Sequence, residues 1–216
     1  MRDRRSGLPL KALESIQSGT LRYTYKGVPC MKNPFDFALY TKLIYDLAPG
    51  SIIEIGTYRG GSALWLADLL RSFGLDSRFF YIDHRYQCDI KDERISFRTG
   101  NALELSSVLT PDIVRKLKRP LLVIEDSAHV YETSLAVMRF FAPIMAPGDY
   151  LLIEDGIVND LTPLGDVYSR LADGPNRAVA DFLAEVGDRF EIDTGYCDFF
   201  GYNFTYNTNG YLKCVR

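Results

Sequence analysis

The feature that most constrains this chain is an apolar run that ends at an acidic residue and continues into a loop containing glycine. The segment reads Ile52-Ile53-Glu54-Ile55-Gly56-Thr57-Tyr58-Arg59-Gly60-Gly61-Ser62. The apolar residues predict a buried strand, and the run at 63–67 predicts the start of a helix. Glycines let the backbone approach a ligand, and a helix N-terminus offers free N–H groups. The segment therefore predicts a strand–loop–helix binding site.

The spacing of the glycines favours one kind of ligand. The pattern Glu-x-Gly-x-x-x-Gly-Gly-Ser differs from the Gly-x-Gly-x-x-Gly that holds the pyrophosphate of a dinucleotide. Glu54 stands before the first glycine, where it would repel a phosphate and could pair with a cationic amine. S-adenosylmethionine carries such an amine and no phosphate. For this segment alone, the alternative is a glycine turn between a strand and a helix that binds no ligand.

Predicted strands and helices alternate along the chain. Apolar segments predict strands at 52–55, 79–82, 95–98, 121–124 and 150–153. Helical patterns lie at 63–73, 111–117 and 132–141, after a helix that begins at Asn33-Pro34 and ends before Pro49-Gly50. This alternation predicts an α/β, Rossmann-like, doubly wound and mostly parallel sheet with helices on both faces.

The chain is long enough for one domain with a sizeable core. Its 216 residues predict a single domain, 1–216, in which 1–48 form an N-terminal helical or cap segment with a short helix at 8–16. Residues 156–177 are rich in Pro, Gly, Asp and Asn and predict a long active-site loop. A helix at 178–186 and closing strands at 190–192 and 211–214 follow.

An aromatic run separates the two closing strands. Its members are Tyr196, Phe199, Phe200, Tyr202, Phe204 and Tyr206, interleaved with Asn203, Asn207 and Asn209. One interpretation is a core strand followed by a turn. The other is a platform for a carbohydrate or aglycone, or a dimer surface, since aromatic side chains are enriched at interfaces.

Composition excludes several classes of partner. The formal net charge of −3 argues against a nucleic-acid backbone. No segment approaches the roughly 20 apolar residues of a membrane span. The basic residues in 1–5 precede no apolar run, so they do not predict a secretory signal. We expect a cytoplasmic homo-oligomer. The chain has no Cys-x-x-Cys pair, so we expect its four cysteines to be reduced thiols. They are Cys30, Cys88, Cys197 and Cys214.

Polar residues follow each predicted parallel strand. They are Glu54, Asp83, Asn101, Glu125-Asp126 and Glu154-Asp155. The carboxyl ends of parallel strands meet at one edge, where ligands bind. Helix capping would explain any single Asp or Asn, but the complete set predicts a ligand site. Asp83 follows the second strand, where an acid accepts hydrogen bonds from both ribose hydroxyls.

Three of these carboxylates suggest a metal. Asp126, Glu154 and Asp155 belong to adjacent strand ends, where they would repel one another and raise each other's pKa. A hard divalent cation removes that conflict, and an all-oxygen site suits Mg²⁺ or Ca²⁺ better than zinc. The alternative is that one carboxylate caps a helix and another pairs with a nearby arginine.

His129 is a candidate general base. It stands three residues after Asp126 and is one of two histidines in the chain. A neutral imidazole can accept a proton near pH 7. The alternative is a structural histidine.

These segments now resemble known enzymes. Residues 54–63 resemble motif I of class I S-adenosylmethionine methyltransferases, especially the metal-dependent catechol-type O-methyltransferases. Three other segments resemble the cephalosporin hydroxylase/rhamnosyl O-methyltransferase family: Lys32-Asn33-Pro34-Phe35-Asp36, Asp126-Ser127-Ala128-His129-Val130-Tyr131-Glu132 and Thr205-Tyr206-Asn207-Thr208-Asn209-Gly210-Tyr211-Leu212. The resemblance extends over roughly residues 30–213.

The resemblance implies the class I methyltransferase fold and a role for each site residue. At the methionine end of the cofactor, Glu54 would pair with the ammonium, and the carboxylate would be surrounded by Gly56, Tyr58 and Ser62. Asp83 would hold the ribose, and Asn101 and Ala102 would flank the adenine. Asp126 would also contact the cofactor and would bind Mg²⁺ together with Glu154 and Asp155. The catechol enzymes carry a lysine base three residues after their first metal ligand. His129 occupies that place here.

The predicted function is therefore S-adenosylmethionine-dependent O-methylation of a sugar or oligosaccharide hydroxyl, for example in a methylated mannose or rhamnose glycan. Mg²⁺ or another divalent cation would assist, with His129 as general base. The polar and aromatic tail at 202–211 and the loop after Asp155 favour a saccharide. The alternatives are O-methylation of a specialised metabolite with an antibiotic or aromatic hydroxyl, a non-catalytic cofactor-binding partner subunit, and a nicotinamide-dependent oxidoreductase.

Overall fold

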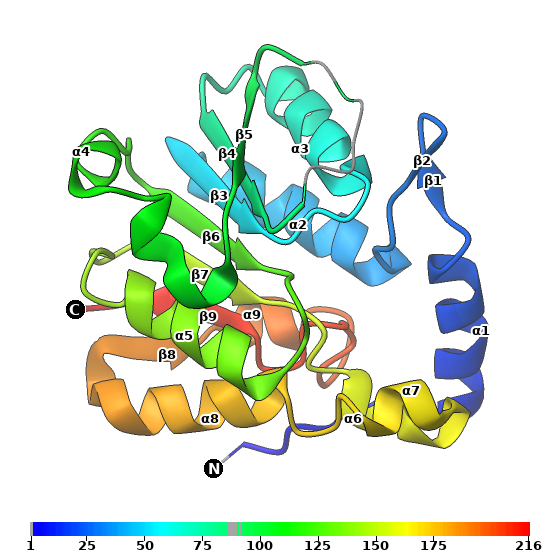
Figure 1. The fold of residues 1–216 in the computed structure, drawn as a ribbon. Helices are drawn as coiled ribbons and strands as arrows, with labels where there is room; N and C mark the ends of the chain where they lie inside the picture. The colour runs from blue at the N-terminus through cyan, green and yellow to red at the C-terminus, as the bar shows by residue number, and fades with distance from the viewer. Residues whose placement is uncertain (1, 86–89, 91) are drawn as a thin grey trace.

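The computed structural model describes residues 2–85, 90 and 92–216, and a single twisted sheet organises most of them (Figure 1). The sheet has seven strands in the order β5-β4-β3-β6-β7-β9-β8. Their bounds are β3 Ser51–Ile55, β4 Arg78–Asp83, β5 Ile95–Thr99, β6 Leu121–Glu125, β7 Tyr150–Ile153, β8 Phe190–Ile192 and β9 Tyr211–Cys214. The first five are parallel, and β9 pairs antiparallel with both β7 and β8. The predicted doubly wound α/β fold is confirmed.

The strand order places the ligand-binding edge beside β3. The chain steps from β3 to β4 and β5 on one side, and then returns to place β6 and β7 on the other. The connections therefore reverse direction between β3 and β6. In open parallel sheets such a reversal leaves a crevice outside the carboxyl ends of the two strands.

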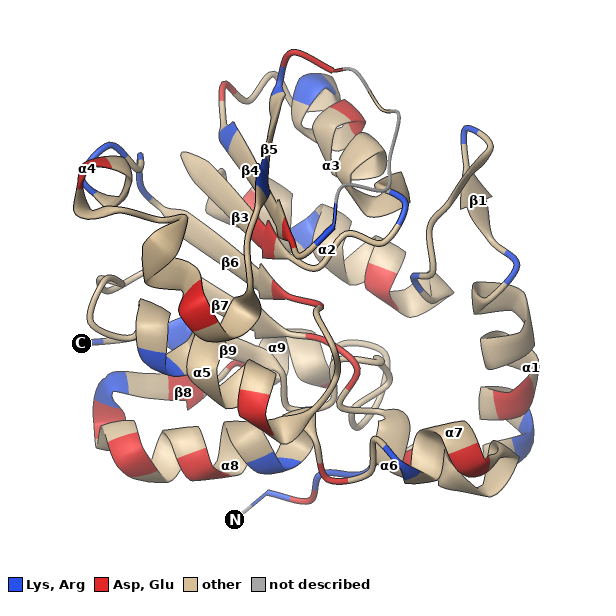
Figure 2. Cartoon of the chain, viewed as in Figure 1, with Lys and Arg blue, Asp and Glu red and all other residues tan. Residues whose placement is uncertain are grey.

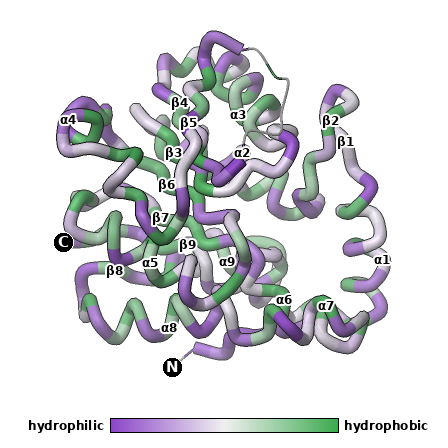
Figure 3. Tube along the Cα trace, viewed as in Figure 1, coloured by the Kyte–Doolittle hydropathy of each residue, from purple (hydrophilic) through white to green (hydrophobic). Residues whose placement is uncertain are grey.

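Helices cover both faces of the sheet because alternate strand residues point to opposite sides. Ile53 and Ile55 pack in the cluster formed with α5 (Tyr131–Phe141) and α8 (Pro175–Val186), whereas Ile52 packs in the cluster formed with α2 (Pro34–Leu47) and α3 (Gly61–Ser72). Strands buried on both faces need continuous apolar runs. The hydrophobic colour along β6 and β7 in Figure 3 shows this pattern.

Several predicted boundaries differ from the structure. The helix predicted at 8–16 is α1, Leu10–Thr20, and the helix predicted at 111–117 is α4, which ends at Val114. The short elements outside the sheet are β1 Thr24–Tyr25, β2 Val28–Pro29, η1 Ala102–Ser107, η3 Gly187–Arg189 and α9 Thr194–Cys197.

The interpretation of 156–177 as a long loop was wrong in secondary structure. Three short helices lie there, α6 Val158–Leu161, η2 Thr162–Leu164 and α7 Asp166–Ser169. Ile157 and Leu161 are buried with Leu13 of α1 and with Tyr206. This packing orders the segment, and helices of four residues are too short to leave a periodic signal in the sequence.

The aromatic run is only partly buried: Tyr196 and Tyr206 are buried, whereas Tyr202 is exposed. The described residues between α9 and β9 contain no strand, so the interpretation as a core strand was wrong. Phe199 and Phe200 are exposed, whereas Asn203 and Asn209 are buried. The Nδ2 atoms of these asparagines donate to the carbonyls of Arg5 at 3.1 Å and Asp3 at 2.8 Å, respectively. Buried amides thus attach the N-terminal segment to the C-terminal one.

Asp36 joins the start of α2 to the chain before β9. The Asn33 side chain caps α2 by accepting hydrogen bonds from the N–H groups of Phe35 at 2.8 Å and Asp36 at 3.1 Å. The buried Asp36 carboxylate accepts from Asn33 Nδ2, the Thr205 hydroxyl and the Tyr206 N–H. Burial raises the pKa of Asp36 to about 7, although the bonds from Thr205 and Tyr206 lower it.

Three of the four predicted thiols can be located. Cys30, Cys197 and Cys214 are free and buried, and Cys88 lies outside the described residues. Within the described residues, the structure contains no helix of the length and apolar character needed to cross a membrane.

We expect Asp36→Ala to destabilise the fold by on the order of 3 kcal/mol, because it leaves several buried donors without an acceptor. Urea denaturation monitored by circular dichroism measures the effect. Asp76→Ala is the matched control, since Asp76 is fully exposed and pairs only with Lys118 at the surface; it should change stability little. Equal stabilities of the two variants would show that the hydrogen bonds accepted by Asp36 are not required for the stability of the fold.

Candidate functional site

A cavity of about 380 Å³ opens at the carboxyl ends of the parallel strands, where acidic residues gather in Figure 2. Nine predicted site residues line it: Gly56, Tyr58, Ser62, Asp83, Asn101, Ala102, Asp126, His129 and Asp155. The loops after β3 to β7 all contribute to its walls. Glu54 and Glu154 do not line the cavity, and both are buried. Four of the polar residues predicted from the strand ends thus lie in one cavity: Asp83, Asn101, Asp126 and Asp155.

The glycine loop brings the ends of β3 and β6 into contact. Gly56 has a φ of 93°, and a Cβ there would lie 1.9 Å from the carbonyl oxygen of Asp126. At the start of α3, a Cβ on Gly61 would lie 2.0 Å from the carbonyl oxygen of Pro29. No side chain fits in either place. These glycines therefore serve backbone packing around the cavity as well as access for a ligand.

Asp83 anchors the same loop. Its Oδ2 accepts hydrogen bonds from the N–H groups of Thr57 at 2.8 Å and Tyr58 at 3.3 Å. Its Oδ1 accepts from the N–H of Arg85 at 3.1 Å and lies 3.0 Å from His84 Nδ1. The carboxylate thus holds the loop after β3 against the end of β4. Both of its oxygens have partners within the chain, so contact with a ribose would add to these bonds.

Asn101 and Ala102 lie at the opposite end of the cavity from β7. Asn101 Oδ1 accepts from the N–H of Leu103 at 3.0 Å and so caps η1. Helix capping is the alternative to ligand binding as an explanation for a polar residue at a strand end. Both residues also line the cavity, so they remain available to contact an adenine.

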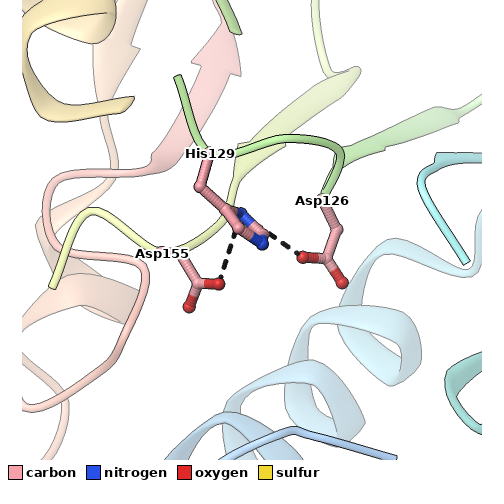
Figure 4. Close-up of side chains that lie close together, drawn as sticks. All are labelled: Asp126, His129 and Asp155. Atoms are coloured by element: carbon pink, nitrogen blue, oxygen red, sulfur yellow. Dashed lines mark ion pairs between the residues drawn. The ribbon is translucent and has the colours of Figure 1, made fainter. Parts of the chain in front are cut away.

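His129 lies between two carboxylates (Figure 4). Its Nδ1 is 3.3 Å from Asp155 Oδ2 and 3.9 Å from Asp126 Oδ1. Both His129 and Asp155 adopt positive φ angles, 55° and 57°, which bring their side chains to the cavity from short turns. Burial lowers the pKa of His129, but Asp155, Asp126 and Glu125 outweigh it and raise that pKa above its usual value. The imidazole is therefore a stronger base than a free histidine.

Glu154 belongs to a second, buried group. It accepts hydrogen bonds from Lys32 Nζ at both carboxylate oxygens and from the Tyr40 hydroxyl. Lys32 Nζ also donates to Asp126 Oδ2 at 2.6 Å and lies 4.0 Å from Glu54 Oε1. Burial raises the pKa of Glu54 to about 7, although Lys32 opposes that rise. Among the residues that the structure describes, none forms a hydrogen bond with either oxygen of the Glu54 carboxylate.

Lys32 lies among the carboxylates of the candidate site and was not predicted from the strand ends. It stands before the α2 cap, far in sequence from the ends of the strands in the seven-stranded sheet, and its side chain is only 4% exposed. A buried lysine needs anionic partners, but sequence alone does not show which carboxylates will surround it. The single available signal was its place in the segment 32–36 that carries the family resemblance.

The donor set fits a hard divalent cation. Potential ligand atoms of Asp126, His129 and Asp155 lie within 4.8 Å of one another, and so do those of Glu54, Asp126 and Glu154. Asp126 belongs to both groups, which divide the predicted trio of Asp126, Glu154 and Asp155 between them. Carboxylate oxygens predominate, as Mg²⁺ prefers. In the second group one ammonium, that of Lys32, lies within 4.0 Å of all three carboxylates.

Gly56→Ala should abolish cofactor binding, because the added Cβ would displace the Asp126 carbonyl and the positive φ would be strained. Calorimetry with S-adenosylhomocysteine measures the loss. Gly19→Ala is the matched control, since a Cβ there, near the end of α1, meets no atom within 4 Å. If Gly56→Ala bound the ligand with the control's affinity, the tight loop contact would not be needed.

Comparison with known proteins identifies the family of this chain. The family model described as Rhamnosyl O-methyltransferase/CmcI matches residues 18–215. The rhamnosyl O-methyltransferase of Mycobacterium leprae is 30% identical over 197 residues, which cover 88% of this chain and 82% of that protein. The protein of the same name from Mycobacterium tuberculosis strain H37Rv is 28% identical over 196 residues, covering 88% of this chain and 77% of the relative.

A solved structure described as cmcI-D160 Mg-SAM has a TM-score of 0.72 and 25% identity, and the match covers all of this chain and 88% of that one. The MycE methyltransferase from the mycinamycin biosynthetic pathway, in complex with Mg and SAH, shares the fold at a TM-score of 0.55 and 16% identity, over 94% of this chain and 55% of that one. The fold is thus the Rossmann-like fold of class I methyltransferases. The chain belongs to the rhamnosyl O-methyltransferase/CmcI family and is an O-methyltransferase.

Proposed function

We propose that this enzyme transfers the methyl group of S-adenosylmethionine to a sugar hydroxyl with the help of a divalent cation. One observation carries the proposal. A single cavity joins the glycine loop after β3 to the Asp126, His129 and Asp155 group after β6 and β7. The cavity therefore offers a cofactor cradle and an acid–base group within one space.

The cofactor would lie along the strand ends. Gly56, Tyr58 and Ser62 would surround the methionine end, Asp83 the ribose, and Asn101 with Ala102 the adenine. Glu54 is completely buried and does not line the cavity, so direct pairing with the methionine ammonium would require the side chains in front of it to rearrange.

Asp126 and Asp155 would hold the cation, with Glu154 as the further carboxylate that the family resemblance implies. S-adenosylmethionine supplies a methyl group on a sulfonium, and a bound divalent cation supplies a Lewis acid that lowers the pKa of a hydroxyl. Holding the acceptor oxygen in line with the methyl group accounts for much of the acceleration. The chain's part is therefore positioning together with removal of one proton.

His129 would remove that proton. Its Nδ1 lies 3.3 Å from Asp155 Oδ2, so Nδ1–H can be directed to this carboxylate and Nε2 left to accept the proton of the acceptor hydroxyl. The carboxylates that raise the histidine's pKa also stabilise the imidazolium that forms. Asp155 therefore has a positioning role besides its proposed role in holding the cation.

A sugar acceptor fits the mouth of the cavity. Tyr58 and Met31 line it and are 51% and 44% exposed. Such side chains offer apolar surfaces on which the apolar faces of a sugar ring can stack. The two curated relatives described above are both named rhamnosyl O-methyltransferases, which supports a deoxysugar. Methylation assays that compare a rhamnoside, a mannoside and a catechol test this substrate class, and a preference for the catechol would reject the sugar.

Activity should require a divalent cation. Protein treated with EDTA should lose turnover and regain it with Mg²⁺, since no Lewis acid then lowers the pKa of the acceptor hydroxyl. Asp126→Asn should abolish most turnover in a methyl-transfer assay while S-adenosylhomocysteine still binds in calorimetry. Full activity of the metal-stripped enzyme would reject the metal-assisted proposal.

His129→Ala should lower kcat by roughly 10²–10⁴-fold, the usual effect of losing a general base. His129→Gln is the matched variant, because it retains a polar side chain but no basic nitrogen, and it should be equally slow. Steady-state kinetics measure kcat, and calorimetry should show nearly unchanged affinity for S-adenosylhomocysteine. A His129→Gln enzyme with the wild-type kcat would show that the histidine is structural.

A further inference from the structure

Lys32 occupies the centre of the buried carboxylate group. Its Nζ contacts Asp126 and both oxygens of Glu154, and no other lysine or arginine within the described residues forms an ion pair with Glu54, Asp126 or Glu154. Two constraints hold it in place. The backbone N–H of Lys32 donates to the carbonyl of Cys30 at 2.9 Å, and Asn33, the next residue, is completely buried as the cap of α2.

The ammonium and a divalent cation would compete for the same oxygens. Asp126 Oδ2 and both oxygens of Glu154 already accept hydrogen bonds from Lys32. A cation bound by Asp126 and Glu154 would have to replace the ammonium, and two cations so close would repel each other strongly in a buried site. Lys32 must therefore move for Glu154 to become a metal ligand.

Glu54 offers the displaced ammonium a new partner. Its carboxylate is fully buried, and neither oxygen has a hydrogen-bond partner. Lys32 Nζ is 4.0 Å from Glu54 Oε1, so a movement of about 1 Å would make a normal hydrogen bond. The flexible four-carbon stem of a lysine permits such a movement.

We infer that Lys32 is an internal cation that competes with the divalent cation for Asp126 and Glu154 and shifts to Glu54 when that cation binds. This inference rests on the proposed function, which supplies the divalent cation. It explains why Glu54, at the end of the motif strand, is a buried acid whose oxygens accept no hydrogen bond from the described residues. It also gives Lys32 a positioning role rather than a catalytic one.

Titration of the metal-free protein with Mn²⁺ tests the competition. Lys32→Met should bind Mn²⁺ at least about ten-fold more tightly than the wild type, because no ammonium then opposes the metal. Lys42→Met is the matched control, since it removes the same charge from an exposed lysine paired with Asp46; its effect should be small because surface charges are screened. Unchanged or weaker affinity of Lys32→Met would overturn the inference.

The wild-type protein provides a second test that does not depend on whether the variant folds. A crystal structure with Mn²⁺ should show Lys32 Nζ within about 3.2 Å of a Glu54 oxygen and a Glu154 oxygen on the metal. If Mn²⁺ bound only the Asp126, His129 and Asp155 group while Lys32 remained on Glu154, the inference would be wrong.

Asp126→Asn separates this inference from the proposed function. If the wild type binds Mn²⁺ much more tightly than Asp126→Asn but Lys32→Met binds no more tightly than the wild type, the metal site stands and only the competition by Lys32 is rejected. If the wild type and Asp126→Asn bind Mn²⁺ equally weakly, the metal site itself is rejected, and the inference falls with it.

Discussion

The burial of several carboxylates around one lysine is the constraint on which this site depends. Taking ionised carboxylates out of water is costly unless partners are supplied. Lys32 and Tyr40 supply them to Glu154, and Lys32 also supplies one to Asp126. Glu54 is left without a hydrogen bond. The cluster is therefore only partly compensated by the chain, which is the state expected of a site built to receive a further cation.

The backbone around this cluster is as tightly constrained as its charges. The loops after β3 and β6 touch at Gly56 and the Asp126 carbonyl, and Asp83 holds the first of these loops through its backbone N–H groups. The glycine motif therefore positions Asp126 as well as shaping a cofactor cradle. Asp126 therefore joins the glycine loop after β3 to the group formed with His129 and Asp155.

Segments far apart in sequence support this unit from outside. Asp36 connects the helix that follows Lys32 to the chain before β9, and Asn203 and Asn209 hold the N-terminal residues. The polar residues of the C-terminal tail are thus structural, whereas its exposed aromatic residues, Phe199 and Phe200, contribute little to the core. The three segments that resembled one family lie at these junctions and at the site.

The sequence by itself determined the strands, their parallel arrangement and the edge at which ligands bind, because apolar runs and strand-end polar residues are local patterns. It did not show the short helices within 156–177 or the buried asparagines, because contacts between residues far apart in the sequence order them. Only the tertiary structure decided how the acids are divided: Asp155 turns to His129, and Glu154 turns to Lys32. The physical reason is that the partner of a buried charge is chosen by three-dimensional proximity, and Lys32 is more than 90 residues from Asp126 along the chain but 2.6 Å from it in space.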